Sequence, residues 1–302
     1  MIINNYIKHP IKSCVEAARM RQWLNWMGDE KYIKLVWKMK MDYPLDLKNP
    51  KTFNEKMQWL KLNDRKKIYN SMVDKYEVKK IVGEKIGTEH VIPTFAVWNS
   101  IDDIDLSVLP NKFVLKCTHD SGGLVICRDK SKLNVQDAKE KLNKSLKNNY
   151  YNIGREWPYK NVTPRILAEK YVQNGNDQNL TVYKIFNCSG QPTLFQVIQN
   201  DKTPEESIDY FDTEWNKLNL KQNFPNSATP VKKPKQLGEM LEYARRLSKG
   251  FPFLRTDFYI VNGQVFFSEF TFYSDCGFKK FDPHIWDEKL GALIDLSLVK
   301  DV

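Results

Sequence analysis

The stretch that most constrains the fold is residues 251–271, FPFLRTDFYIVNGQVFFSEFT, in which two apolar runs flank Asn262-Gly263. Apolar runs on both sides of Asn-Gly give the strongest short-range signal for a β-hairpin. Polar residues interrupt both runs at a spacing of two, which puts each pair on one face of its strand. These polar residues are Arg255 and Asp257 on the first strand and Glu269 and Thr271 on the second.

The register of this hairpin decides whether the two polar pairs share a face. With a two-residue Asn-Gly loop, Asp257 lies opposite Ser268 and Glu269 points to the other side of the sheet. A three-residue loop, Val261-Asn262-Gly263 with Gly263 left-handed in a bulge, shifts the register by one residue and brings the two pairs together. We predict this bulged register.

In that register Asp257 and Glu269 converge on one face of an apolar sheet. Two desolvated carboxylates repel each other, so they need a cation between them. Mg²⁺ carried by a nucleotide phosphate suits this position, because it takes oxygen ligands and needs only one or two protein carboxylates. The alternative is a solvated strand face on which Arg255 forms an ion pair with Glu269.

A second stretch, residues 112–129 (KFVLKCTHDSGGLVICRD), predicts two strands joined by a glycine-rich loop. Ser121-Gly122-Gly123 would let backbone N–H groups approach an anion, with the positive charge of Lys116 beside them. The loop has no Walker motif, and a hairpin turn without a ligand is the alternative. We interpret His119 either as a donor to a phosphate or as a residue that caps the loop.

Two further segments carry candidate binding residues. In the loop at 148–165, Arg155, Trp157 and Tyr159 could hold an acidic sugar, with arginine for the carboxylate and tryptophan for the ring face. The alternative is a packed loop. Lys184 lies in the middle of an apolar strand, where an unpaired ammonium is costly, so it needs an anion nearby.

The chain of 302 residues has the composition of a globular protein, with 41% hydrophobic residues and no apolar run long enough to span a membrane. No secretory signal is visible at the N-terminus, so we expect the protein to be cytoplasmic. The five cysteines lack CxxC spacing, which argues against a disulfide framework or a zinc site.

The formal net charge of +10 predicts an anionic partner, and about half of it lies in residues 1–40, which hold eight Lys and Arg and three Asp and Glu. This stretch predicts one or two helices that carry Trp23, Trp26 and Trp37 among basic residues. Such helices either contact an anionic membrane surface peripherally or pack on the protein itself. Nucleic acid is not an expected partner, because no recognition motif accompanies the charge.

The order of these features resembles the ATP-grasp superfamily: a strand lysine, a glycine-rich hairpin loop, a Glu-Lys-Tyr-Val strand end, a mid-strand lysine, then R-x-D and E-x-T on a late hairpin. More narrowly, the chain resembles the TupA-like branch found among bacterial surface-polysaccharide genes. The matching segments are NPKTFNEKMQWLK, VDKYEVKKIVGEKIG, LPNKFVLKCTHDSGG, RILAEKYV, KPKQLGEMLEYARRLSKGFPFLRTDFY and FFSEFTFYSDCG.

The resemblance implies an α+β fold in which an N-terminal α/β domain, a small strand-rich lid and a C-terminal antiparallel sheet enclose ATP between the last two. The expected segments are a basic helical segment at 1–41, the α/β domain at 42–110, the lid at 111–172 and the C-terminal subdomain with the metal site at 173–302. Within the α/β domain, Thr52 and Glu55 have the spacing of a capping box.

The resemblance also implies roles for individual residues. The expected nucleotide contacts in the phosphate region are Lys75, Lys116, His119, Ser121, Gly122, Gly123 and Lys184. The expected adenine hinge is Glu169, Lys170, Tyr171 and Val172. The expected ligands of Mg²⁺ are Asp257, Glu269 and Thr271, although most ATP-grasp enzymes have Asn at the last position. Arg255 and Lys184 are the expected catalytic residues.

ATP-grasp enzymes are similar in their chemistry: a carboxylate attacks the γ-phosphate of ATP, and an amine then displaces phosphate from the acyl phosphate. For the TupA-like branch the resemblance suggests that an amino acid or another amine is joined to a uronic acid of a capsular or surface polysaccharide, or of its precursor. Two alternatives from other classes stay open. One is a sugar kinase or glycosyltransferase of the same pathway, and the other is a non-catalytic basic protein that binds membranes or polyanions.

Overall fold

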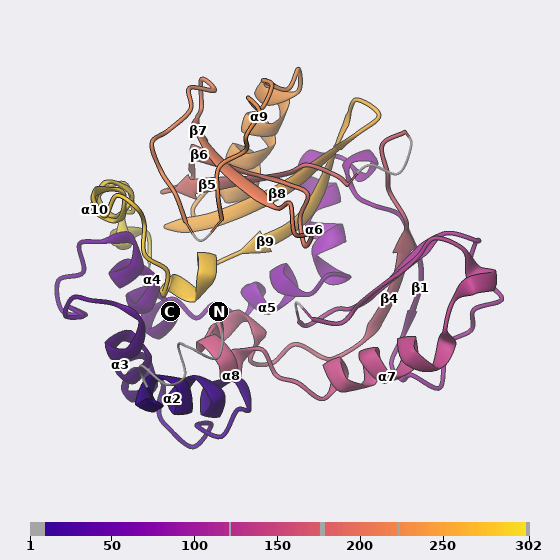
Figure 1. The fold of residues 1–302 in the computed structure, drawn as a ribbon, viewed down its shortest axis with the longest axis horizontal. Coiled ribbons are helices and arrows are strands. Elements are labelled where there is room, and N and C mark those ends of the chain that lie inside the picture. The colour runs from indigo at the N-terminus through magenta and orange to yellow at the C-terminus, as the bar shows by residue number, and fades with distance from the viewer. Residues whose placement is uncertain (1–9, 121, 176–178, 223, 300–302) are drawn as a thin grey trace.

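The structure, a computed structural model, describes residues 10–120, 122–175, 179–222 and 224–299. Its strands form two antiparallel sheets, one of four strands in the order β1-β4-β2-β3 and one of five strands in the order β7-β6-β5-β8-β9. Helices lie between and around the sheets (Figure 1). The α+β class predicted from the sequence is confirmed. Within the described residues, no helix combines the length and apolarity needed to cross a membrane.

The N-terminal part of the chain is mostly helical. Its helices are α2 (Pro10–Met20), α3 (Asp29–Lys40), α4 (Phe53–Asn63), α5 (Ile68–Val73) and α6 (Glu77–Ile86). α4 begins at the predicted capping box, in which the Glu55 N–H donates to Thr52 Oγ1 (3.2 Å) and the Thr52 N–H donates to Glu55 Oε2 (3.0 Å). α6 ends at Gly87, whose φ of 106° favours glycine.

The four-stranded sheet consists of β1 (Thr94–Trp98), β2 (Phe113–Cys117), β3 (Leu124–Cys127) and β4 (Ile166–Lys170). α7 (Val135–Leu146) covers one face and buries Leu142 against Phe113 and Ile166. β1 precedes the boundary predicted near Pro110, yet it pairs with β4, which satisfies its backbone hydrogen-bonding groups. The four-stranded sheet therefore begins before that boundary, and residues 42–110 contribute a strand to it.

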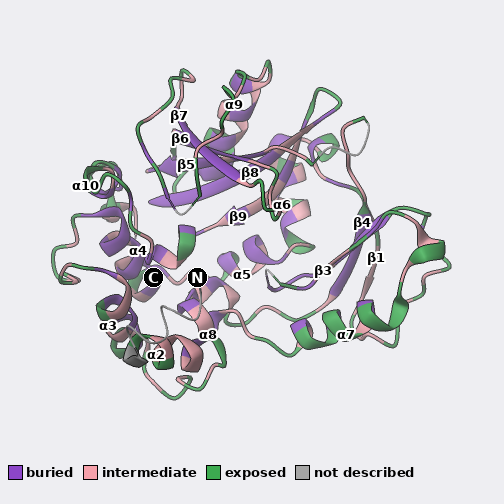
Figure 2. Cartoon of the chain, in the orientation of Figure 1, coloured by how far each residue is buried: buried purple, intermediate pink, exposed green. Residues whose placement is uncertain are grey.

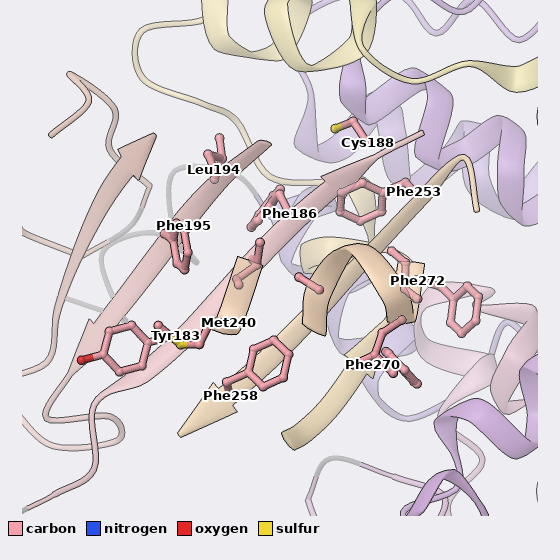
Figure 3. Close-up of a cluster of buried hydrophobic side chains, with 14 of the residues drawn as sticks. Tyr183, Phe186, Cys188, Leu194, Phe195, Met240, Phe253, Phe258, Phe270 and Phe272 are labelled. Atoms are coloured by element: carbon pink, nitrogen blue, oxygen red, sulfur yellow. The ribbon is translucent and has the colours of Figure 1, made fainter. Parts of the chain in front are cut away.

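The five-stranded sheet forms the centre of the larger hydrophobic core. Its strands are β5 (Val182–Cys188), β6 (Gln191–Gln199), β7 (Ser207–Asp212), β8 (Phe253–Val261) and β9 (Gln264–Thr271). α9 (Leu237–Ser248) packs on one face, where Met240 lies among aromatic side chains of β5, β6 and β8 (Figure 3). On the other face Phe53 of α4 contacts Phe186 and Phe253, with ring centroids 5.9 and 4.9 Å away. Figure 2 shows that the strands are largely buried while the outer side of α7 is exposed.

The β8–β9 hairpin brings the two polar pairs together as predicted, but its loop and its bulge differ from the prediction. Arg255 pairs with Thr271 and Asp257 pairs with Glu269, so the polar pairs share one face. The loop, however, is the two-residue Asn262-Gly263 turn, with φ of 51° and 83°, and Val261 pairs with Gln264. The extra residue is Ser268, at a bulge within β9. The predicted three-residue loop is therefore wrong, because the shift of register arises inside the strand.

Short helices complete the chain. They are η1 (Thr88–His90), η2 (Lys130–Lys132), α8 (Tyr151–Gly154), η3 (Trp157–Tyr159), η4 (Ser274–Gly277), α10 (Ile285–Ala292) and η5 (Leu296–Leu298). α10 packs on α4, where the buried Asp287 carboxylate accepts hydrogen bonds from the Asn54 N–H (2.9 Å), the Asn54 side chain (2.9 Å) and the Tyr43 hydroxyl (2.6 Å). This contact attaches the C-terminal end of the fold to the N-terminal helices.

The contact between α10 and α4 predicts a strong effect of adding one methyl group. A Cβ on Gly291 would collide with the Lys51 carbonyl oxygen and lie 2.7 Å from the Phe53 nitrogen. We expect Gly291→Ala to lower the free energy of unfolding by about 1–3 kcal/mol, because backbone must move. Gly238→Ala is the control, since Gly238 is also helical and has open space around it; it should stabilise by up to about 1 kcal/mol. Equal melting temperatures for the two variants would contradict this packing.

Candidate nucleotide-binding site

A cavity of about 630 Å³ lies between the two sheets. Ten of the residues predicted from the sequence line it: Lys75, Lys116, Gly123, Glu169, Lys170, Tyr171, Val172, Lys184, Asp257 and Glu269. Its lining holds seven Lys and Arg and five Asp and Glu, counted over all lining residues. The excess of positive charge suits a polyanionic ligand.

Glu169 at the end of β4 connects the small sheet to α6. Its Oε1 forms an ion pair with Lys116 of β2, and its Oε2 accepts a hydrogen bond from Lys79 Nζ (2.9 Å). Burial opposes ionisation of Glu169, but Lys116 and Lys79 together hold its pKa below the ordinary value. The carboxylate thus keeps two half-buried ammonium groups at the cavity wall.

Hydrogen bonds that involve Lys75 and Asp120 fix the glycine-rich loop. The Lys75 N–H donates to the Thr118 carbonyl oxygen (3.0 Å), and Lys75 Nζ donates to the Asp120 carbonyl oxygen. The Asp120 side chain in turn accepts the Gly123 N–H (3.1 Å) and the Ser145 hydroxyl. Gly123 is required for space, since a Cβ would lie 2.5 Å from Ser145 Oγ.

The structure does not place three of the predicted phosphate-contact residues, Ser121, Gly122 and His119, at the cavity wall. Ser121 lies outside the described residues, and Gly122 does not line the cavity. His119 does not line it either, because its ring is buried and Nε2 lies 3.1 Å from the Asn148 carbonyl oxygen. The structure therefore does not bring His119 to the cavity wall.

The β5, β8 and β9 strands place a compact charge cluster on the opposite wall. Arg255 Nε and Nη2 donate to the two oxygens of Asp257, both at 2.8 Å, and Lys184 Nζ lies 3.7 Å from Asp257 Oδ2. Burial lowers the pKa of the Arg255 guanidinium, but the negative charges of Asp257 and Glu269 outweigh this effect and raise the pKa above its ordinary value. Asp257 is nearly inaccessible, with a side chain 2% exposed, so this pair acts as one rigid unit.

Glu269 is the more accessible carboxylate of the cluster. Its side chain is 43% exposed, and its ion pair with Arg255 Nη2 is long (3.5 Å). Burial opposes its ionisation, but Lys184 and Arg255 lower its pKa. Thr271 lies beside it, opposite Arg255 on the same face, but does not line the cavity.

This donor set fits a metal ion that arrives with a phosphate. No group of three or more His, Cys, Asp or Glu side chains in the described ranges is placed to hold a metal by itself. Mg²⁺ needs one or two protein carboxylates when phosphate oxygens and water complete its coordination. Glu269 offers an accessible carboxylate at the cavity, and Asp257 lies opposite it across the β-ladder.

The predicted acidic-sugar residues are separated by the structure. Arg155 is buried beneath the turn between α2 and α3, where Nη2 donates to the carbonyl oxygens of Leu24 (2.8 Å) and Met27 (3.1 Å). The expectation that Arg155 binds substrate is therefore wrong, because its guanidinium is already held inside the protein. Trp157 and Tyr159 both pack against the larger hydrophobic core. Burial raises the pKa of the Tyr159 hydroxyl, and the negative charges of Glu156 and Glu269 raise it further.

Comparison with known proteins agrees with this arrangement. The sequence model of the TupA-like ATP-grasp family matches residues 55–295. The chain belongs to the TupA-like ATP-grasp family. A search of curated proteins found no match to this member of the family.

Solved structures similar to this TupA-like ATP-grasp chain include three ligases and synthetases. One is D-alanine-D-alanine ligase from Helicobacter pylori, with 15% identity, 73% of this chain and 60% of that chain covered, and a TM-score of 0.39. N5-carboxyaminoimidazole synthetase from Staphylococcus aureus has 15% identity, coverage of 74% and 53%, and a TM-score of 0.41. D-alanine-D-alanine ligase from Bacillus anthracis, complexed with ATP, has 13% identity, coverage of 66% and 54%, and a TM-score of 0.37. The chain spans little more than half the length of these three chains.

Among the residues of the candidate site that were not predicted, Lys79 and Asp120 hold other site residues in place. Lys79 lies four residues after Lys75 and reaches the same cavity from α6, so the helical spacing was an available signal. Asp120 holds Lys75 through its backbone and Gly123 through its side chain. No local pattern distinguishes it from an ordinary turn aspartate, because its partners come from three separate segments.

The Glu169 cluster predicts a dependence of stability on pH. We expect Glu169→Gln to lower the unfolding free energy by about 1–3 kcal/mol at pH 7, because Lys116 and Lys79 lose their counter-charge. The pKa of Glu169 is lower in the folded protein than in the unfolded chain. The contribution of Glu169 to the unfolding free energy is therefore complete at a pH above its unfolded pKa, and it disappears as the pH falls through its folded pKa. The difference in melting temperature between wild type and variant should therefore shrink in acid.

The control is Glu77→Gln, which changes a half-exposed carboxylate that accepts a hydrogen bond from Arg165 (2.9 Å). We expect this surface change to cost less than about 1 kcal/mol. If Glu169→Gln were no more costly than Glu77→Gln at neutral pH, the role of Glu169 in balancing the two lysines would be refuted.

Proposed function

We propose that this protein is an ATP-dependent carboxylate-amine ligase. In this proposal it joins an amino acid or another amine to a uronic acid of a capsular or surface polysaccharide, or of its precursor, and releases ADP and phosphate. The observation that carries it is the gathering of Lys116 and Lys184 with the carboxylates Asp257 and Glu269 around one cavity between the sheets. Family membership adds the ATP-grasp chemistry.

ATP would lie along this cavity from β4 to β9. The adenine would meet the chain at residues 169–172, mainly through backbone groups, and the phosphates would point to Lys116 and Lys184. Arg128 supports the hinge end, since its Nε donates to the Tyr171 hydroxyl (3.1 Å). Lys75 fixes the glycine-rich loop that would cover the phosphates.

The reaction would proceed in two balanced steps. A carboxylate oxygen of the sugar bonds to the γ-phosphorus, and the bond from this phosphorus to the bridging oxygen breaks as ADP leaves. The amine nitrogen then bonds to the acyl carbon, inorganic phosphate leaves, and the nitrogen loses a proton to solvent. Mg²⁺, when bound at Glu269 and Asp257, would neutralise charge on the transferring phosphoryl group.

The charged side chains have distinct tasks in these steps. Lys116 and Lys184 would orient the phosphates and offset their charge, because phosphoryl transfer depends chiefly on positioning and electrostatics. Arg255 holds Asp257 in a fixed orientation and adds positive charge beside Glu269. An acyl phosphate is sensitive to water, so the four-stranded sheet would act as a lid over the cavity.

Formation of an acyl phosphate is the decisive test of this function. ATP, Mg²⁺, hydroxylamine and a panel of uronic-acid saccharides should yield a hydroxamate with the wild-type protein. Glu269→Ala should reduce this product by at least about 100-fold, because the accessible carboxylate of the charge cluster is lost. Glu242→Ala is the control, since Glu242 forms only an exposed ion pair with Arg245.

The alternatives give different products in the same assay. A stable phosphoester or a glycoside without hydroxamate would identify a sugar kinase or a glycosyltransferase and refute the ligase. A protein that binds polyanions with no ATP turnover would leave ADP absent under every condition, and its function would not change in Glu269→Ala.

Lys184 gives a second test that concerns binding alone. We expect Lys184→Met to weaken binding of a non-hydrolysable ATP analogue with Mg²⁺ by about 10- to 100-fold, because one charge-assisted contact with phosphate is lost. The exposed Lys232→Met variant should bind like the wild type. Calorimetry measures both, and unchanged affinity in Lys184→Met would remove this lysine from the phosphate site.

A further inference from the structure

The turn between α2 and α3 carries Trp23 and Trp26, the two most exposed large apolar side chains of the described residues, and the exposed Met20 ends α2 directly before it. Met20, Trp23 and Trp26 are 54%, 63% and 80% exposed. Burying a tryptophan removes about 150–250 Å² of surface from water, so two exposed tryptophan side chains leave a large hydrophobic stabilisation unused. Adjacent exposed aromatic residues of this kind mark an interaction surface.

The turn that presents these residues is firmly held. Leu24 and Met27 pack against the hydrophobic cluster formed by α3, and their carbonyl oxygens accept the two hydrogen bonds from Arg155. The Trp23 N–H donates to the Ala18 carbonyl oxygen (2.9 Å). The exposure of Trp23 and Trp26 therefore belongs to a fixed conformation, in which Leu24 and Met27 point inward.

The surroundings of the turn are basic. The Arg21 guanidinium lies over the Trp23 ring, 5.0 Å from its centroid. The other exposed cations on α2 and along the outer side of α3 are Lys12, Lys31, Lys34 and Lys38. The nearby carboxylates are already paired: Glu16 with Arg19 and Lys40, Glu30 with Lys34, and Asp29 with Arg65. The surface therefore offers positive charge beside Trp23, from Arg21, and along the two helices that the turn joins.

We propose that the turn between α2 and α3 binds an anionic lipid surface, with Trp23 and Trp26 in the headgroup region and the basic residues against the lipid phosphates. Tryptophan favours the interface because its ring is apolar while its N–H is polar, and lysine and arginine add attraction to anionic lipids. A second copy of the chain fits less well, since a two-fold contact would set Arg21 and the α3 lysines against their own copies.

This surface differs from the amphipathic helix that the sequence suggested. The apolar side of α3, with Tyr32, Ile33, Val36 and Trp37, is buried against the protein. Trp37 even donates its indole N–H to the Tyr43 carbonyl oxygen (2.7 Å). The lipid contact is therefore made by the turn, at the outer end of the helical pair at the lower left of Figure 1.

A short segment links this surface to the Glu269 end of the cavity. Arg155 holds the turn, Glu156 Oε1 accepts a hydrogen bond from Cys276 Sγ (2.9 Å), and Tyr159 lies near Glu269. Lipid binding at the turn would thus fix the orientation of the site relative to the membrane, which suits a lipid-linked acceptor. Only this last step rests on the proposed function; the lipid contact itself does not.

Vesicle co-sedimentation tests the proposal on the full chain. The probes are vesicles of phosphatidylcholine alone and of phosphatidylcholine with phosphatidylglycerol in equal amounts. We expect the wild type to bind the anionic vesicles, and W23S/W26S to lower its partition coefficient by about tenfold or more, since each ring contributes buried apolar area. The matched control F95S/V108S removes two other exposed apolar side chains, 41% and 60% exposed, and should bind like the wild type.

Folding and catalysis are followed separately. W23S/W26S should keep the melting temperature and the ATP turnover of the wild type in solution, because both side chains are exposed and lie outside the cavity. Glu269→Ala should bind vesicles normally, so failure of the ligase function and failure of the lipid contact are distinguishable.

Three outcomes would overturn the lipid proposal. One is a wild-type protein that binds neither kind of vesicle. Another is W23S/W26S binding that equals the wild type. The third is a dimer in sedimentation equilibrium that W23S/W26S dissolves, since the surface would then be occupied by a second copy of the chain.

Discussion

Charge balance across the cleft is the constraint on which the rest of the structure depends. Lysines from α6, β2 and β5 and an arginine from β8 are drawn together where a polyanion would bind, and without partners these cations would destabilise the fold. Glu169 on one wall and Asp257 on the other supply the internal counter-charge. Glu169 also joins the four-stranded sheet to α6, and Asp257 joins β8 to β5 within the five-stranded sheet, so the ion pairs that prepare the site also stabilise each wall of the cavity.

Residues 151–159 are the second organising element, because they contact three separate parts of the fold. Arg155 fixes the turn between α2 and α3, Glu156 meets Cys276 after β9, and the Asn70 side chain donates to the Pro158 carbonyl oxygen (2.5 Å). The N-terminal helices are therefore attached to the region around the site through a few buried polar contacts. A rigid attachment of this kind is what an anchoring surface needs in order to orient a cavity.

Much of the fold could be predicted, since its signals are local. The Thr52 capping box and the strands around Asn262-Gly263 were both predicted from spacing and turn chemistry. The residues alone suggested an anion near Lys116 and Lys184 and Mg²⁺ between Asp257 and Glu269, and the resemblance combined these four residues, all of which line the cavity, into one nucleotide site. The prediction for Arg155, made from the residues alone, failed, because a basic residue in an aromatic loop has the same local pattern whether its guanidinium faces a substrate or two buried carbonyl groups.

By itself the sequence determined the elements and the alternation that puts Arg255 with Asp257, and Glu269 with Thr271, since a strand has a period of two residues. Only the tertiary structure decided the rest. The bulge at Ser268, the ion pairs of Glu169 and the exposure of Trp23 and Trp26 depend on how distant segments meet. A side chain's partner and its access to solvent are properties of packing between elements, and no local pattern carries them.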